Sequence, residues 1–299
     1  MLDFRDIALE DKPTVEGYLK QSGFQCCEYS FVTMFIWRET YKTMIAEYGG
    51  FLVALWRIQD ARSYLYPAGR GSPEELARCV EAICRHGRQS GERWSIGGIT
   101  KENTLLLESL FPGRFSFTTN RGWYDYIYNA RDLIDLAGKK YHSKRNHINK
   151  FIEINGAPDY RNITEDLMPE CRKAYETWLR EKGGAKGSFR AEYLAVKSCF
   201  DHYSALGLTG GAIMTKDGMC SFSLGSPLND DTFDVHIEKA VQDCPRGFTV
   251  INQQFAEHAA SGYRYINREE DMGIEGLRKA KLSYHPAYLL EKYQARLKT

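Results

Sequence analysis

The predicted strands and helices of this 299-residue chain follow one order twice, and this repeat constrains the fold more than any single motif. In the first half, alternating segments over 41–58 meet at a Gly-Gly pair, which is typical of a β-hairpin. A third strand, a long helix, a strand, a short helix and a final strand near 123–129 follow. The second half passes from a hairpin at 209–226 through the same order to a final strand near 287–293. The repeat predicts an α/β protein with two similar domains, each a mixed sheet flanked by helices.

The boundary between the two domains is expected near residue 135. A chain of this length suits two domains of roughly 150 residues each, and the order of elements gives domains 1–135 and 136–299. No low-complexity linker separates the halves, so we expect them to pack together. In the first domain, Ser72 followed by Pro73 predicts the start of the long helix, because serine caps the first turn and proline suits its first position.

Positive charge is concentrated between residues 139 and 151, although the whole chain has 40 Lys plus Arg against 39 Asp plus Glu. A net charge of +1 gives no overall attraction to nucleic acid or anionic membranes, so any attraction to an anion is local. On a helix with about 100° between residues, Lys144 and Arg145 flank an apolar stripe that contains Tyr141 and Phe151. Two interpretations remain open: these side chains lie along apolar surface with their charges in water, or they bind phosphate or carboxylate oxygens.

A second charged segment, 267–286, combines acids at the start of a predicted short helix with basic residues near its end. The helix dipole accounts for most of these charges. It does not account for Arg278 and Lys281, which share the helix face of Ile274 and Leu277. Basic residues on an inward face in two segments of one neutral chain favour an anionic ligand.

The strand predicted at 232–240 carries the candidates for proton transfer. Alternation along a strand places Asp234, His236 and Glu238 on one side and Lys239 on the other. A reaction that moves a proton needs a side chain that can accept it, and titratable groups that share a strand face suit that task. An exposed sheet face with charge pairs explains the same pattern, so this alternative stays open.

Several other classes of protein are disfavoured by what the sequence lacks. The histidines show no metal-ligand spacing, so no metal is expected. Neither a serine-hydrolase elbow nor a Walker loop is present. The eight cysteines form no C-x-x-C pair, and no apolar run approaches the ~20 residues that span a bilayer. We therefore expect a cytoplasmic protein without a membrane span, whose cysteines are reduced and mostly buried.

Three segments, 138–151, 236–239 and 267–281, carry a family resemblance that extends over essentially the whole chain. They resemble an uncharacterised bacterial family that is similar to the C-terminal catalytic part of phosphatidylglycerol lysyltransferases. The resemblance implies two tandem GNAT-like domains, that is, domains of the acyl-CoA N-acyltransferase fold. It further implies kinship with enzymes that transfer an aminoacyl group from aminoacyl-tRNA to a lipid headgroup or a cell-wall peptide.

One departure from that fold concerns the donor. The loop that binds the CoA pyrophosphate in classical members is reproduced neither at 67–75 nor at 242–250. Backbone N–H groups at a helix N-terminus remain available there for a phosphate. We therefore expect no tightly bound cofactor, and acyl-CoA and aminoacyl-tRNA remain alternative donors.

These observations predict an acyl or aminoacyl transferase that acts on an anionic or amine-bearing acceptor in a basic cleft between the domains. The alternative is a noncatalytic binding module for an anionic metabolite, a lipid headgroup or a tRNA acceptor end. Tyr284 and His285 are reserve candidates for the site. The predicted catalytic residues are Glu238 and His236, and the predicted ligand-binding residues are Lys144, Arg145, Lys239, Arg268, Arg278 and Lys281.

Overall fold

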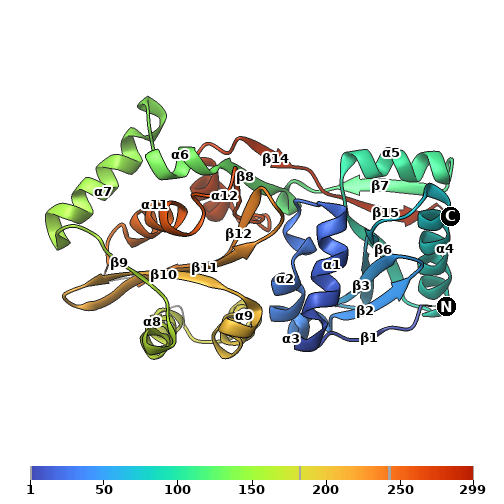
Figure 1. Cartoon of the computed structure of the whole chain (residues 1–299), viewed down its shortest axis with the longest axis horizontal. Coiled ribbons are helices and arrows are strands. Elements are labelled where there is room, and N and C mark those ends of the chain that lie inside the picture. The colour runs from blue at the N-terminus through green and yellow to red at the C-terminus, as the bar shows by residue number, and fades with distance from the viewer. Residues whose placement is uncertain (1, 182, 242–243, 299) are drawn as a thin grey trace. The chain divides into compact units, whose positions relative to one another are not determined.

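The computed structural model describes residues 2–181, 183–241 and 244–298, and it divides the chain into two compact units (Figure 1). The first unit is Met1–Asp125 with Glu270–Glu275 and Leu289–Thr299, and the second is Tyr126–Glu269 with Gly276–Tyr288. This division differs from the expected domains 1–135 and 136–299. The reason is that two C-terminal segments belong to the first unit. No single boundary in the sequence can therefore separate the two units.

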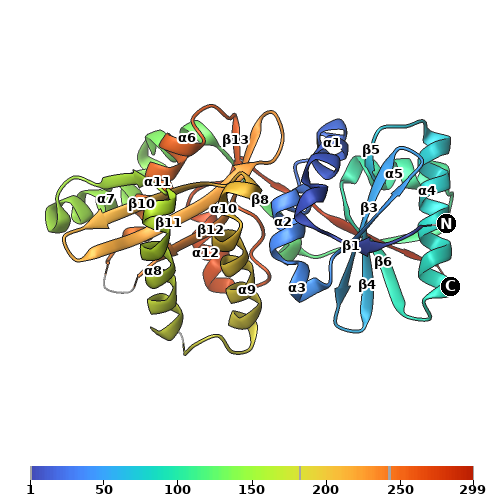
Figure 2. The ribbon, with the colours of Figure 1, turned by 60° about the horizontal axis from the view of Figure 1, so that its bottom comes forward.

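The first unit is built on a mixed sheet (Figure 2). Its strands lie in the order β1, β2, β3, β4, β6, β15 and β7, and β5 pairs with β3. The bounds are Arg5–Asp6 (β1), Met44–Tyr48 (β2), Phe51–Ile58 (β3), Ala61–Leu65 (β4), Ala68–Gly69 (β5), Arg93–Ile99 (β6), Phe115–Thr119 (β7) and Tyr293–Leu297 (β15). β4 and β6 are parallel, and the other paired strands run antiparallel. The predicted hairpin at 41–58 is therefore confirmed.

The helices of the first unit include the predicted long helix. Ser72 Oγ accepts a hydrogen bond from Glu75 N (3.2 Å), and the Glu75 carboxylate accepts one from Ser72 N (2.7 Å), so the predicted N-cap is confirmed. The apolar side of this helix packs on the sheet in a core that includes Val53, Val80 and Ile96. The helices are Lys12–Ser22 (α1), Phe31–Ile36 (α2), Arg38–Tyr41 (α3), Pro73–Gln89 (α4) and Lys101–Leu110 (α5), with 3-10 turns at Leu9–Asp11 (η1), Cys27–Tyr29 (η2) and Arg121–Trp123 (η3).

The second unit has its own mixed sheet, in the order β14, β8, β13, β12, β11, β10 and β9. The strands are Asp125–Asn129 (β8), Asp159–Asn162 (β9), Thr209–Thr215 (β10), Gly218–Pro227 (β11), Thr232–Ala240 (β12), Tyr265–Asn267 (β13) and Tyr288–Leu290 (β14). Its helices are Ala130–Asp135 (α6), His142–Asn155 (α7), Met168–Glu181 (α8), Ser188–Asp201 (α9), Tyr203–Leu206 (α10), Gly247–Ala259 (α11) and Glu275–Leu282 (α12), with 3-10 turns at Lys139–Tyr141 (η4) and Glu165–Leu167 (η5). Figure 1 shows α11 on one face of this sheet and α8 and α9 on the other.

The two sheets repeat one pattern of strand pairing. Starting from β1 or from β9, three antiparallel pairs are followed by one parallel pair and then by another antiparallel pair. The sixth strand of each sheet, however, comes from the other half of the sequence: β15 lies in the first sheet and β8 in the second. The predicted repeat is thus present, but β8, predicted as the final strand of the first half, lies in the second sheet. The strand predicted near 287–293 is β14 of the second sheet, and β15, which follows it, lies in the first sheet.

The structure bears on two further expectations, the state of the cysteines and the lack of a membrane span. The expectation of reduced cysteines is wrong for Cys220 and Cys244, which form a disulfide between β11 and the segment before α11. The other six cysteines form no disulfide and are buried. Among the described residues, no helix has the length and apolar character needed to cross a membrane.

Candidate functional site

The strand that carries both predicted catalytic residues, β12, contains a β-bulge. Gly225 of β11 pairs with Val235, but the neighbouring Leu224 pairs with Ile237, so His236 is an extra residue on β12. An extra residue shifts the alternation of side chains by one position. Residues before and after the bulge therefore no longer follow one alternating pattern.

The bulge separates the two predicted catalytic residues. Before the bulge, Phe233 packs against α11, and after it Glu238 also reaches α11, from which it accepts a hydrogen bond. His236 instead contacts Ser226 on the face that α9 covers. The prediction that Asp234, His236 and Glu238 share one face is therefore wrong, because it assumed an uninterrupted strand.

Glu238 lies in a group of polar side chains on the α11 face. Arg268, which follows β13, donates from Nη2 to Glu238 Oε1 at 2.8 Å. Asn252 of α11 donates from Nδ2 to Glu238 Oε2 at 3.1 Å. Arg268 Nη1 and Asn252 Oδ1 are buried, and neither has a hydrogen-bond partner among the described residues. Leaving such a group unsatisfied costs about 1–3 kcal/mol, so this donor and this acceptor mark a place for a polar group from a ligand.

Lys144 joins this group through an aromatic ring. Its Nζ donates to Ser283 Oγ at 2.7 Å and lies 3.7 Å from the centre of the Tyr284 ring. Arg268 Cζ lies 4.9 Å from the centre of the same ring, so two cations share one aromatic partner. Burial lowers the pKa of Lys144 to about 8, and the nearby Arg268 guanidinium adds to that shift while Glu238 opposes it. Burial also raises the pKa of Tyr284 to about 12, which keeps its phenol neutral.

Lys281 and two buried tyrosines hold the segment that carries Tyr284. The Tyr141 hydroxyl donates to the Tyr284 carbonyl at 2.9 Å, and the Tyr128 hydroxyl donates to the Lys281 carbonyl at 2.7 Å. Lys281 Nζ in turn donates to the carbonyl of Arg268. Lys281 therefore contacts the backbone of the site, and it orients Arg268 through that backbone.

Two further predicted ligand-binding residues, Arg145 and Lys239, lie elsewhere. Arg145 donates to the carbonyls of Leu136 and Gly138 just after α6. Lys239 forms an ion pair with Glu192 of α9 (2.8 Å) on the opposite face of the sheet from Glu238. Arg278 is half-buried on α12. Of the eight predicted residues, Glu238, Arg268 and Lys144 come together, with Lys281 beside them.

Asn252 was not predicted from the sequence, and Tyr284 was predicted only as a reserve candidate for the site. Asn252 is 4% exposed and stands in α11 next to the buried Val250 and Ile251. A polar residue within a buried helical run was the available signal. Such a residue indicates a buried hydrogen bond but does not identify the partner of Asn252. That partner is Glu238, which faces α11 because of a bulge that the sequence does not indicate.

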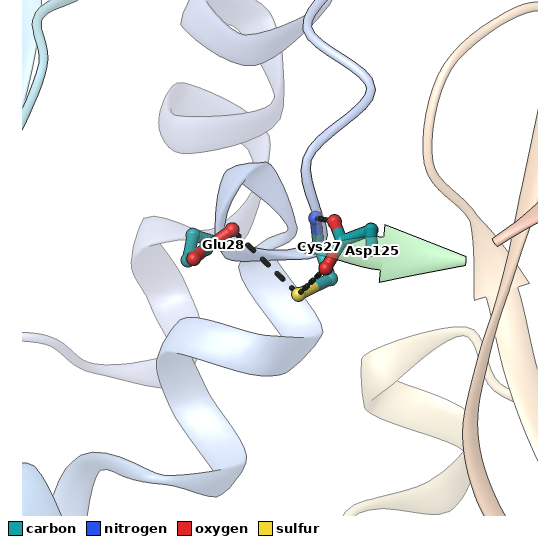
Figure 3. Close-up of side chains that lie close together, drawn as sticks. All are labelled: Cys27, Glu28 and Asp125. Atoms are coloured by element: carbon teal, nitrogen blue, oxygen red, sulfur yellow. Dashed lines mark hydrogen bonds between the residues drawn. The ribbon is translucent and has the colours of Figure 1, made fainter. Parts of the chain in front are cut away.

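The first unit contains a second buried polar cluster that the sequence did not indicate. Figure 3 shows Cys27, Glu28 and Asp125, with Cys27 Sγ at 3.4 Å from Asp125 Oδ1. Lys292 Nζ enters this group and donates to Glu28 (2.7 Å), Asp125 (2.9 Å) and Glu270 (2.9 Å). Burial alone would lower the pKa of Lys292, but these carboxylates hold it well above its usual value. The ammonium therefore balances the carboxylates as an internal cation.

Comparison with known proteins shows the family and the fold. The family model described as "Phosphatidylglycerol lysyltransferase, C-terminal" matches residues 20–296. A crystal structure of a conserved protein of unknown function from Bacteroides thetaiotaomicron is 36% identical, covers all of both chains and has a TM-score of 0.94. The structure of L-PGS from Bacillus licheniformis is 16% identical over 95% of this chain and 91% of that one, with a TM-score of 0.66, which shows the fold alone.

A curated relative, the uncharacterized protein MYCGA3080 of Mycoplasmoides gallisepticum, is 26% identical over 56% of this chain. The match spans 54% of that relative, about half of its length. The chain has the tandem GNAT fold, as the sequence predicted.

Proposed function

Since the chain belongs to the phosphatidylglycerol lysyltransferase C-terminal family, we propose that it is an acyl or aminoacyl transferase whose reaction takes place beside Glu238, Arg268 and Lys144. One observation carries this proposal. Next to the Glu238 carboxylate, Arg268 Nη1 and Asn252 Oδ1 are buried without a hydrogen-bond partner among the described residues. A substrate that brings a carbonyl oxygen and an N–H or O–H group would satisfy both.

The chemistry of acyl transfer matches these groups. An amine or hydroxyl of the acceptor attacks the carbonyl carbon of the donor, and the bond from that carbon to the leaving sulfur or oxygen breaks. We assign Glu238 to receive the proton of the nucleophile and to return it to the leaving group. Arg268 Nη1 donates to the carbonyl oxygen as it gains negative charge. Lys144, when protonated, binds an anionic part of the donor or acceptor.

Acyl-CoA and aminoacyl-tRNA are the two donors that this proposal allows, and both carry phosphates that a lysine can bind. The acceptor carries an amine or an anionic headgroup. We place the reaction in the bacterial cytoplasm, where both donors are made.

Replacing Glu238 with Gln tests the catalytic role. The amide keeps the hydrogen bond from Arg268 but cannot take a proton, so we expect kcat to fall by about 10²–10⁴ while substrate affinity changes little. The measurement is transfer of radiolabel from acetyl-CoA or from a mixture of aminoacyl-tRNAs to a panel of amines and lipids. Glu192→Gln is the matched control: it removes a carboxylate that also pairs with a basic residue, Lys239, on the other face of the sheet.

A noncatalytic binding module is the second candidate, and the missing CoA loop at 67–75 and 242–250 favours it. It predicts no transfer by the wild-type protein with any donor, while anions retained on the purified protein are detected by native mass spectrometry and are lost in Arg268→Gln. Turnover that disappears in Glu238→Gln and persists in Glu192→Gln excludes this candidate. Turnover that persists in Glu238→Gln contradicts the assigned base.

A further inference from the structure

His236 belongs to a group of four side chains on the α9 face of the second sheet, apart from the Glu238 group. Ser226 alternates along β11 with Phe222, which packs against α9, and Asp234 stands opposite Ser226 in the ladder. Glu269 lies on the same side, because its Oε1 is 3.4 Å from His236 Nδ1. The group therefore lies between the sheet and α9.

The imidazole of His236 has a fixed orientation. Its Nε2 lies 2.8 Å from Ser226 Oγ, which is a normal hydrogen bond. Its Nδ1 faces two carboxylates, at 3.4 Å from Glu269 Oε1 and 3.5 Å from Asp234 Oδ2. If Nε2–H donates to Ser226 and the ring is neutral, Nδ1 presents a lone pair to both carboxylates. Nδ1 therefore holds either a proton, in a neutral ring whose Nε2 accepts from the Ser226 hydroxyl, or a metal ion.

The distances distinguish between these two cations. Charge-assisted N–H···O bonds to a carboxylate are about 2.7–2.9 Å long, and both distances from Nδ1 exceed that range. Ligand atoms at about 2.0–2.1 Å from a tetrahedral zinc ion stand about 3.3–3.4 Å apart. The two distances match that spacing, and all three donor atoms lie within 4.8 Å of one another.

We propose that Asp234, His236 and Glu269 bind a divalent metal ion, through Oδ2, Nδ1 and Oε1. One imidazole nitrogen with two carboxylate oxygens suits zinc rather than magnesium, which prefers oxygen ligands alone. In the metal-bound form, Nε2–H donates to Ser226 Oγ, which holds the tautomer in which Nδ1 coordinates the ion. The charges also balance, because two carboxylates neutralise the ion in a buried place.

The exposure of the ligands gives the ion a route of entry. The side chains of Asp234 and His236 are fully buried, whereas that of Glu269 is 25% exposed. The ion enters from the Glu269 side, where a water molecule completes the four ligands. In the first unit, the comparable group of Cys27, Glu28 and Asp125 differs because it already contains the ammonium of Lys292. The metal site is independent of the proposed transfer reaction, which lies on the other face of the sheet.

Titration of the whole chain with zinc tests the proposal. The protein is stripped with a chelator, dialysed and titrated with ZnSO₄ in competition with a chromophoric chelator. We expect one tight zinc per chain, at least tenfold weaker binding in His236→Ala and in Glu269→Gln, and a rise of the melting temperature on zinc addition in the wild type alone. His142→Ala, an exposed histidine on α7, and Cys27→Ser in the first unit are controls that leave this binding unchanged.

Cobalt gives a readout of geometry that does not depend on stability. Co²⁺ in the wild type is expected to show the intense visible absorption of a tetrahedral ion, and Glu269→Gln should alter that spectrum even if His236→Ala fails to fold. Stoichiometric binding that disappears in Cys27→Ser, or that persists in both ligand variants, overturns the proposal. Absence of tight zinc binding to the wild type also overturns it.

Discussion

At the scale of single residues, Lys144 is a buried group whose charge changes just above neutral pH. Its pKa is lowered to about 8 by burial, with Arg268 adding to the shift. Lys144 is therefore charged below about pH 8 and neutral above it. The unfolded chain keeps this proton up to the ordinary lysine pKa of 10.5. The energetic cost of burying the ammonium is therefore complete below about pH 8, and it falls as the pH rises from about 8 to 10.5.

We predict that the affinity for an anionic ligand falls as the pH rises through about 8. Inorganic pyrophosphate at constant ionic strength is a suitable probe, with its dissociation constant measured by calorimetry between pH 6.5 and 9.5. Lys144→Arg should move the fall in affinity to higher pH, because a guanidinium stays protonated over this range. Lys150→Arg is the control, since Lys150 is exposed and pairs with Glu153. An unchanged pH profile in Lys144→Arg would remove Lys144 from the site.

The residues that make up the site were partly predictable from sequence. Lys144 was predictable because it flanks the apolar stripe of a helix, and Glu238 because it was expected to share a strand face with other titratable groups. Arg268 was a candidate because it lies in the segment 267–281, which carries the family resemblance. Asn252 was not named, because a single amide in an apolar helix has many possible partners. The separation of His236 from Glu238 was not predictable either, since one extra residue in β12 changes the face and leaves no signature in the sequence.

At the scale of elements, the basic segment 139–151 combines two roles on one helix. The predicted helix is present as η4 and α7, with Tyr141 and Phe151 buried. Lys144 points into the polar group around Tyr284, but Arg145, its neighbour, hydrogen-bonds the chain that follows α6. The concentration of charge thus has no single cause, and helical periodicity alone could not separate the two residues.

Arg145→Ala should destabilise the protein without changing ligand affinity. The substitution leaves the carbonyls of Leu136 and Gly138 without their donor, which we expect to lower the free energy of unfolding by about 1–3 kcal/mol. Urea unfolding measures that loss, and calorimetry with pyrophosphate measures affinity. Lys150→Ala, on the exposed side of the same helix, should change neither quantity. A loss of affinity in Arg145→Ala without a loss of stability would return Arg145 to the ligand site.

At the scale of the whole molecule, the exchange of β8 and β15 governs how the chain is divided. The sequence predicted the repeated order of elements, because hairpin turns, helix caps and periodicity are local signals. Long-range pairing decides which sheet a final strand joins. In both sheets, the last strand of the parallel pair has an antiparallel neighbour, so β8 and β15 could each pair in either position. That choice could not be read from local patterns.

Lys292 is the residue that joins the separate segments of the first unit. It lies just before β15 and binds Glu28 and Asp125 from the first segment and Glu270 from the second. Lys292→Met should lower the free energy of unfolding by about 3–5 kcal/mol, because it leaves buried carboxylates without their cation. Lys298→Met, an exposed lysine after the same strand, should have little effect. A loss equally small in both variants would mean that the network does not hold the segments together.

Glu28 makes the stability of this junction depend on pH. Burial raises the pKa of Glu28 to about 7, and the charges of Asp125 and Glu270 add to the shift while Lys292 opposes it. The unfolded chain releases this proton near pH 4.5, so between about 4.5 and 7 the folded protein binds more protons than the unfolded one. The stabilisation due to protonated Glu28 is therefore complete below pH 4.5 and is lost as the pH rises through 7.

Glu28→Gln should remove this pH dependence, because the amide stays neutral at every pH. In the wild type, the contribution of Glu28 to the free energy of unfolding should fall with a slope of up to about 1.4 kcal/mol per pH unit in that window. Urea unfolding at intervals between pH 4.5 and 8.5 gives the two curves. They should converge near pH 4.5, separate between about 4.5 and 7, and stay a constant distance apart above 7, with the variant more stable. Glu102→Gln, exposed on α5, is the control whose curve should follow the wild type. Parallel curves for Glu28→Gln and the wild type would mean that Glu28 stays ionised across the range, and that Lys292 outweighs the burial of its carboxylate.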